Sequence, residues 1–430
     1  MKVLNYKDKN FWKDIGDACR PAAKSDEIPA IVSGVIKSIR ERGDAALEEL
    51  TLKFDGASVK TKDLRVSDKE IKRAEKNVPA SDKKMMRQAI ACVKEYHLHT
   101  KPKNWRARNP HGAVVGENFY PIRRVGIYIP GGNAPLVSTV VMTATLAKIA
   151  GCPEICVCTP PRKDGTVNDY ILCVLSMLGI KEIYKAGGAQ AIAAMGVGTE
   201  TIPAVEKLYG PGNAFVIEAK RQLFGEVGCD LLPGPSEVLI VADSSANPRY
   251  IAADLLSQAE HGSGKEKIFL VSTSAKLVES VRGKISELAP TLSRAEKLLK
   301  IISDGCYVAV VPNIKAAIET ANYIAPEHME LHVKDAAKLA LKITTAGAIL
   351  VGEDTPTVLG DFTAGPSHTL PTGRTGRFSG GLQLVDFMRR GSFVKYDKKS
   401  LAKAKDVVAA FSAMETLDAH GNSLLERLKK

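Results

Sequence analysis

From Arg124 onward, short β-branched apolar runs alternate with longer helical patterns, and this alternation restricts the fold more than any other feature. The runs VGIYIP and EICVCTP are each followed by an apolar helical pattern, LVSTVVMTATLAKIAG and YILCVLSMLGI. EIYKAGGAQAIAAMG then repeats strand, glycine turn and helix. Because parallel strands need helical crossovers between them, the sequence predicts an α/β fold built on parallel sheets.

A second alternating stretch follows the first, so two α/β halves succeed one another. VLIVADS, KIFLVST, VAVVPN and AGAILVG have the composition of buried strands, and YIAADLLSQAEHG and IKAAIETANYI have helical patterns. Residues 31–54 are predicted to be helical because apolar side chains recur three and four positions apart, and Ser67 with Glu70 forms a capping pair. The segment from Tyr396 onward is helical and polar. It has too little apolar content to fold alone, so we expect it to pack on something else, such as another subunit.

A chain of 430 residues is too long for one small core, which predicts two or more packed units. The first residues, MKVLNYKDKNFWKDI, lack the apolar region of a signal peptide. The most apolar stretch, Val137–Cys158, contains Lys148, Pro153 and Glu154, which argues against a membrane span. Eight scattered cysteines suit buried free thiols better than disulfides or a metal site. We therefore expect a cytoplasmic protein.

The formal net charge of +12 raises the question of nucleic-acid binding. The basic residues are dispersed, and no zinc-finger, helix-turn-helix or RNP-type pattern accompanies them. A solvated basic surface explains the charge better, and its field favours the approach of an anionic dinucleotide. We expect no nucleic-acid partner.

Three glycine-rich turns, YIPGGNAP, KAGGAQA and YGPGNAF, lie in one half of the chain. Glycines let backbone N–H groups approach phosphate, and a following helix N-terminus favours anions. None of the turns matches the dinucleotide fingerprint G-x-G-x-x-G, and ordinary tight turns explain each one equally well. Three together favour a nucleotide cleft at the carboxyl ends of the strands.

Several ionisable or amide side chains stand in short motifs that suit metal binding or acid–base work. Gln258 and His261 are three residues apart in SQAEHG, at the end of a helical pattern. Glu327 and His328 are adjacent in APEHMEL, an arrangement that suits two successive proton transfers. A histidine in such a position is more often a packing residue than a ligand, so each motif alone is weak.

The remaining candidates lie nearer the C-terminus. Asp361 follows what we predict to be an apolar strand and a glycine in LGDFTAGPSHTLPT, and His368 in the same loop is a further candidate for substrate contact. Glu415 and His420 are five residues apart, so a helix must end between them if both reach one site. Gln, His, Asp and His together form an N/O ligand set without thiolate, which suits a catalytic zinc.

At these motifs the sequence resembles the histidinol dehydrogenase family. The resemblance runs from about Asp44 to His420. It is carried by VGIYIPGGNAPL, AGGAQAIAA, GPGNAFV, PGPSEVLIVAD, DLLSQAEHG, APEHMEL, GDFTAGPSHTLPTG and the terminal pair Glu415 and His420. SQAEHG and APEHMEL together are very specific to this family.

The resemblance implies a set of site residues. Zinc, one ion per subunit, is expected on Gln258, His261, Asp361 and His420. NAD is expected to contact Tyr128, Gln190 and Asn213. The substrate is expected to contact Ser236, Gln258, His261, Glu327, His328, Asp361, Glu415 and His420, of which Glu327 and His328 are expected to be catalytic.

The resemblance also implies the reaction and the assembly. L-histidinol is oxidised to L-histidine through a retained L-histidinaldehyde while two NAD are reduced, at the end of histidine biosynthesis. The family fold is two incomplete Rossmann-like units with terminal segments exchanged between the subunits of a homodimer that shares its active sites. We expect an N-terminal helical arm over 1–25 and a domain of 26–127 with 237–381 that carries the metal and catalytic residues. An NAD-side domain over 128–236 and a C-terminal helical tail over 382–430 that reaches the partner are expected to complete the chain.

Two other functions compete with this interpretation. The sequence departs from the usual family pattern at three places: GPSH replaces GPNH, METLDAH replaces a glycine-containing pattern, and EHG lacks the proline and acidic residue that often follow it. These departures leave room for a paralogous zinc/NAD alcohol dehydrogenase with another small polar substrate. A non-enzymatic nucleotide-binding protein would keep the glycine turns but has no need of the ionisable and amide residues together: Gln258, His261, Glu327, His328, Asp361 and His420.

Overall fold

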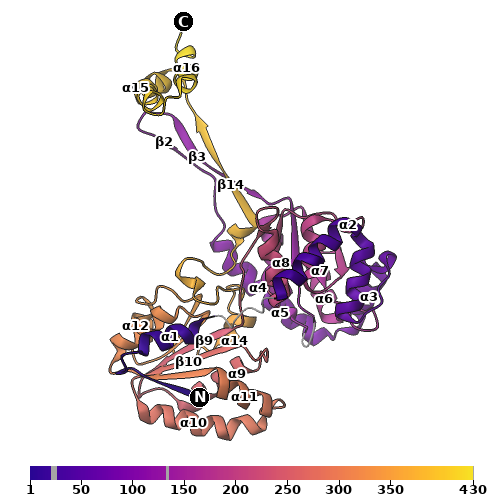
Figure 1. Cartoon of the computed structure of the whole chain (residues 1–430), viewed down its shortest axis with the longest axis vertical. Coiled ribbons are helices and arrows are strands. Elements are labelled where there is room, and N and C mark those ends of the chain that lie inside the picture. Colours follow the sequence, from indigo (N-terminus) through magenta and orange to yellow (C-terminus); the bar gives the residue numbers. More distant parts are fainter. Residues whose placement is uncertain (21–26, 132–134, 430) are drawn as a thin grey trace.

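Two parallel β-sheets, each covered by helices, form the body of the computed structural model, and a thin antiparallel arm extends from it (Figure 1). The structure describes residues 1–20, 27–131 and 135–429. The expected glycine turn YIPGGNAP therefore lies partly outside the described residues. Within the described ranges, no helix combines the length and the apolar character that a membrane span requires.

The larger sheet has six parallel strands in the order β1-β11-β10-β9-β12-β13. Its strands are β1 (Lys2–Asn5), β9 (Glu237–Ala242), β10 (Lys267–Ser272), β11 (Cys306–Val310), β12 (His328–His332) and β13 (Ala348–Val351). Side chains alternate across a strand, so Leu239 and Val241 enter one core and Val238 and Ile240 the other. Strands buried on both faces explain the nearly continuous apolar runs in the sequence.

Helices cover both faces of this sheet. One core contains α1 (Phe11–Cys19), α12 (Ile314–Ile324) and α13 (Ala336–Ala340). The other contains α9 (Pro248–Ala259), α10 (Ala275–Leu288) and α11 (Ala295–Gly305), and the short α14 (Thr357–Phe362) follows β13. The expected N-terminal helical arm is corrected here, because β1 pairs with β11 and Phe11 and Ile15 are buried in the core.

The second sheet has five parallel strands in the order β6-β5-β4-β7-β8. They are β4 (Arg124–Tyr128), β5 (Glu154–Thr159), β6 (Ile183–Lys185), β7 (Lys207–Tyr209) and β8 (Gly228–Cys229). One face packs against α2 (Glu27–Asp55), α7 (Gly188–Val197) and α8 (Ala214–Leu223). The other packs against α3 (Asp68–Asn77), α4 (Ala80–His99), α5 (Val137–Ala150) and α6 (Asp169–Met177). The helices and strands predicted from the alternation therefore form this half as well.

The packing of α2, α3 and α4 corrects one expected domain boundary. We expected residues 26–127 to join 237–381, but Val32, Leu47 and Leu64 lie in one core of the five-stranded sheet, and Ile71 and Val93 lie in the other. The apolar faces of these helices are buried on that sheet, which holds them there. The helical prediction for this region is confirmed, including the capping box of Ser67 and Glu70.

A three-stranded antiparallel sheet, in the order β14-β3-β2, extends away from both bodies (Figure 1). Its strands are β2 (Trp105–Arg108), β3 (Val114–Pro121) and β14 (Met388–Lys395), and the sequence analysis did not predict them. Two helices, α15 (Lys398–Met414) and α16 (Asp418–Glu426), lie at its far end (Figure 1). The arm therefore carries the C-terminal helices away from both parallel sheets.

Candidate active site

The end of α9 carries the first two expected ligands. Asn247 caps the start of this helix, and Pro248 follows in its first turn, where a missing N–H does no harm. Gln258 is buried in the last turn, and His261 follows just beyond the helix. Gly262 has a φ of 70° and reverses the chain there. His261 remains exposed in the single chain and lines a surface cavity together with Arg294 and Lys297.

Strand β12 lies between β9 and β13 and begins at His328, one of the two residues expected to be catalytic. Met329 and Leu331 of this strand enter the core beneath α1 and α12. Side chains alternate, so His328, Glu330 and His332 point to the opposite face, toward α9. A strand that carries three buried ionisable groups on one face departs from the apolar rule for parallel sheets.

The His328 imidazole is held in one orientation. Its Nδ1 lies 3.3 Å from the carbonyl oxygen of Glu237, and its Nε2 lies 3.6 Å from Oδ1 of Asp361. When Nδ1–H donates to that carbonyl, Nε2 is left as the acceptor. Nε2 is buried and has no hydrogen-bond partner. Burial lowers the pKa of His328 to about 4, and the nearby imidazoles of His368 and His261 act in the same direction.

Glu327 lies next to this imidazole, with Oε2 3.6 Å from Nδ1 of His328. The same oxygen accepts a hydrogen bond of 2.8 Å from the backbone N–H of Glu237. Burial raises the pKa of Glu327 well above its ordinary value, and the carboxylates of Glu237 and Asp361 add to the rise. Ser236, half-buried, directly precedes the residue whose backbone contacts both Glu327 and His328.

Asp361 lies in helix α14, so the strand that we expected before it is wrong. Thr357–Phe362 forms only six helical residues, and a segment that short does not distinguish helix from strand by periodicity. Burial raises the pKa of Asp361 to about 6. The carboxylate stays close to His328, which agrees with a site at this end of the six-stranded sheet.

The donors at this end of the sheet suit zinc. Gln258 has a buried amide nitrogen without a partner, and the Nε2 atoms of His328 and His368 are likewise unpaired. Each unpaired buried polar atom costs free energy, so several of them gathered at one end of the sheet favour a ligand there. Gln258, His261 and Asp361 carry N/O donor atoms, the kind of ligand that a catalytic zinc takes from protein.

Glu415 and His420 do not lie near His328 and Asp361 in the single chain. Both are exposed at the far end of the arm, next to α15 and in α16, whereas α9 and α14 lie in the six-stranded body (Figure 1). The helix does end between the two residues, as expected: α15 stops at Met414, and Thr416 has a φ of 54°. Any site that uses His420 with Asp361 therefore needs the arm of another copy.

The three residues expected to contact NAD lie at one edge of the five-stranded sheet. Tyr128 ends β4, Gln190 lies in the first turn of α7 after β6, and Asn213 caps α8 after β7. The carboxyl ends of parallel strands meet at one edge, where α/β proteins bind their ligands. The Tyr128 hydroxyl accepts a hydrogen bond of 3.1 Å from the N–H of Gly188, which links two of the glycine turns.

Two carboxylates near the candidate residues were not predicted from the sequence. Asp55, at the end of α2, accepts hydrogen bonds from Nε2 of Gln190 at 3.1 Å and from the N–H of Gly187 at 3.3 Å. Glu237 contacts the two catalytic candidates through its backbone and accepts from the N–H of Gly373 at 3.0 Å. No local motif marks either residue, because each acts through partners far away in the chain. His368, considered only as a substrate contact, lies close enough to lower the pKa of His328.

Comparison with known proteins identifies the family. The histidinol dehydrogenase family model matches residues 18–428. The chain is 42% identical to a histidinol dehydrogenase of Hydrogenovibrio crunogenus over 94% of its length and 93% of that protein. It is 38% identical to one of Oceanobacillus iheyensis over 100% of its length and 99% of that protein. The crystal structure of histidinol dehydrogenase from Elizabethkingia anophelis superposes with a TM-score of 0.95 at 35% identity, covering 100% of this chain and 98% of that one. This chain belongs to the histidinol dehydrogenase family.

Proposed function

We propose that this enzyme oxidises L-histidinol to L-histidine in two NAD-dependent steps and keeps the intermediate aldehyde in its site. The observation that carries the proposal is the buried His328 imidazole. Its Nδ1 faces a backbone carbonyl, and its Nε2 is unpaired beside Asp361. An imidazole held in this way accepts a proton from an alcohol at Nε2. Membership of the family supports histidinol as the alcohol rather than another small polar substrate.

His328 acts as the base in both oxidations. Its lowered pKa keeps the ring neutral at neutral pH, so Nε2 is free to take the hydroxyl proton as hydride leaves the same carbon for NAD. After the first oxidation, His328 releases its proton to solvent and a second NAD replaces the NADH. Glu327 takes a proton from water, which attacks the aldehyde carbon to give a hydrate. His328 then takes a hydroxyl proton of the hydrate as the second hydride leaves.

Gln258, His261 and Asp361, with His420 from a second copy, would hold the family's zinc. When bound there, zinc orients the substrate and raises the acidity of groups bound to it. The side-chain carbonyl oxygen of buried Gln258 and the carboxylate of Asp361 beside His328 are ligand types that support this assignment. Around the zinc, Ser236 of the same chain and Glu415 of the second copy would complete the substrate pocket.

Tyr128, Gln190 and Asn213 would contact NAD at the edge of the five-stranded sheet. Their common position at the ends of β4, β6 and β7 supports this role. The two parallel sheets then act as two incomplete Rossmann-like units, one carrying the acid–base residues and the other the cofactor.

A domain-swapped homodimer would bring the arm to the site of its partner. Helix α15 exposes Val407, Phe411 and Met414, with 49%, 57% and 76% of their surface accessible. Large apolar side chains gathered on one exposed helix indicate an interface. Burying this helix against a second copy would also deliver Glu415 and His420, which the single chain leaves far from His328.

The test is NADH formation from L-histidinol, followed by absorbance with NAD in excess. The account predicts two NADH for each L-histidinol, loss of turnover after dialysis against a chelator, and recovery when zinc is restored. Oxidation of another amino alcohol in preference to L-histidinol would reject the substrate. One NADH for each L-histidinol, with free aldehyde released, would reject the retained intermediate.

A further inference from the structure

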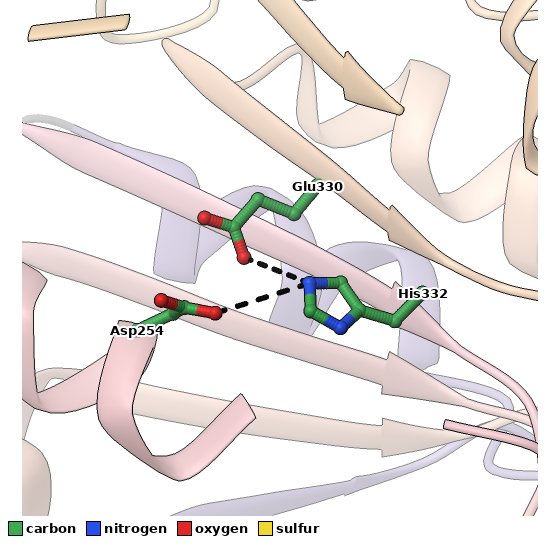
Figure 2. Close-up of side chains that lie close together, drawn as sticks. All are labelled: Asp254, Glu330 and His332. Atoms are coloured by element: carbon green, nitrogen blue, oxygen red, sulfur yellow. Dashed lines mark hydrogen bonds and ion pairs between the residues drawn. The ribbon is translucent and has the colours of Figure 1, made fainter. Parts of the chain in front are cut away.

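A second group of buried ionisable side chains lies directly beneath the candidate active site. Figure 2 shows Asp254 of α9 with Glu330 and His332 of β12, their polar ends turned toward one another. Asp254 is four residues before Gln258, one helical turn away on the same face. Glu330 is two residues after His328 and points to the same face of β12.

The contacts of this network reach a third element. Nε2 of His332 lies 3.1 Å from Oε2 of Glu330 and 3.9 Å from Oδ2 of Asp254 (Figure 2). The other oxygen of Glu330 accepts two hydrogen bonds of 2.7 Å, from the backbone N–H and the hydroxyl of Thr357. Thr357 is the first residue of α14, and Asp361 follows four residues later on the same face. The network thus joins the three elements that carry Gln258, His328 and Asp361.

Burying three ionisable side chains in a core costs free energy that apolar side chains would not cost. Glu330 and His332 are almost completely buried, and burial with the neighbouring Glu330 carboxylate raises the pKa of Asp254 to about 8. Replacing buried ion pairs by well-packed apolar side chains often leaves a protein equally or more stable. The cost indicates that the network does something that apolar packing does not, namely fix direction as well as distance.

The same three residues offer ligand atoms within 4.8 Å of one another, so a second metal site is the competing explanation. The hydrogen bonds argue against it. Both oxygens of Glu330 already have partners, Thr357 on one and His332 on the other. An ion would have to break the contact between Glu330 and His332 in order to enter.

We propose that Asp254, Glu330 and His332 are positioning residues that lock α9, β12 and α14 together and so set the spacing of the zinc ligands Gln258 and Asp361 around His328. The proposal rests on the zinc site of the proposed function. Groups that hold metal ligands in place typically contribute about 10- to 100-fold to metal affinity, because ligand atoms tolerate errors of only about 0.2 Å.

The first experiment measures the zinc dissociation constant of the full-length enzyme by competition with a chromophoric chelator. Glu330→Gln and Asp254→Asn change few atoms but each removes one acceptor oxygen and the carboxylate charge from the network. We expect zinc binding to weaken about 10- to 100-fold in both variants. The matched control is Asp44→Asn, a buried carboxylate of α2 that accepts from Thr201 in the other body, and it should leave zinc affinity unchanged. Circular dichroism of the metal-free proteins confirms that each variant is folded.

A second pair of variants separates positioning from general stability. Thr357→Ser keeps the hydroxyl that donates to Glu330, and Thr357→Val removes it at similar volume. The serine variant should retain wild-type zinc affinity, and the valine variant should lose part of it. This pair decides the question if Glu330→Gln fails to fold.

Three results would overturn the proposal. One is wild-type zinc affinity in folded Glu330→Gln or, if that variant does not fold, in folded Thr357→Val. Another is a wild-type chain that binds two zinc ions, of which Glu330→Gln loses one and keeps the other with unchanged affinity. That result would make the network a metal site. The third is a wild-type enzyme that binds no zinc, which would also reject the zinc site of the proposed function. In the first two cases that function stands.

Discussion

At the adjacent positions 327 and 328, burial acts in opposite directions on the two ionisable groups. It lowers the pKa of His328 to about 4 and raises the pKa of Glu327, because in each case the charged form loses its water. A neutral imidazole and a carboxyl group of high pKa thus stand side by side. Opposite pKa shifts on neighbouring ionisable groups are a common basis for acid–base roles.

Replacement of His328 by alanine tests the base directly. His328→Ala should lower turnover about 100-fold or more, the usual contribution of a general base, while the zinc content stays that of the wild type. The measurement is steady-state NADH formation with metal analysis of the same sample. His99→Ala, an exposed histidine of α4, serves as the control. Normal turnover in His328→Ala would remove the residue from the mechanism.

Asp55 gives a prediction for the pH dependence of stability. Burial raises the pKa of Asp55 to about 6, so the folded state prefers the protonated form. Its stabilising contribution is complete below the unfolded pKa of about 4 and is lost as the pH rises through about 6. The thermal midpoint of the wild type, measured relative to that of Asp55→Asn, should therefore decrease as the pH is raised from about 4 to about 7. A difference that does not change with pH would contradict the assignment.

At the scale of elements, the sequence predicted what depends on local pattern. The parallel strands and their crossover helices have continuous apolar runs and helical spacing, and the structure confirms them. The arm escaped prediction because Trp105–Arg108 is fully exposed and Val114–Pro121 only partly buried, so neither shows the buried face that marks a strand. The zinc, base and NAD candidates came from motifs, whereas Asp55 and Glu237 depend on tertiary partners that no local pattern reveals.

Gly210, directly after β7, and Gly225, after α8, offer a matched pair of glycine substitutions. Gly210 and Gly225 have φ values of 108° and 106°, so alanine is equally strained at both. A Cβ at Gly210 would lie 2.1 Å from the carbonyl oxygen of Tyr128, whereas nothing lies within 4 Å at Gly225. Strain alone costs roughly 1–3 kcal/mol. Gly210→Ala should therefore lose more stability than Gly225→Ala and also bind NAD more weakly, because Tyr128 must move. Thermal unfolding and NAD titration measure the two effects, and equal losses in both variants would contradict the close approach.

At the scale of the whole molecule, the arm separates two parts of one expected site. Gln258, His261, Asp361 and His328 belong to the six-stranded body, and Glu415 and His420 lie at the far end of the arm (Figure 1). Apolar residues of α15 are exposed in the single chain, and the second copy of the proposed homodimer would bury them. No local pattern predicts this separation. The apolar-poor C-terminal segment and the family resemblance were the two indications of a partner.

Subunit complementation tests this account most directly. His328→Ala and His420→Ala are each purified, mixed, dissociated and allowed to reassociate, and NADH formation from L-histidinol is measured. If the arm of one subunit completes the site of the other, each mixed dimer contains one intact site. Random pairing then restores about a quarter of wild-type activity. Dimers shown to be mixed that remain inactive would contradict a site shared between two chains.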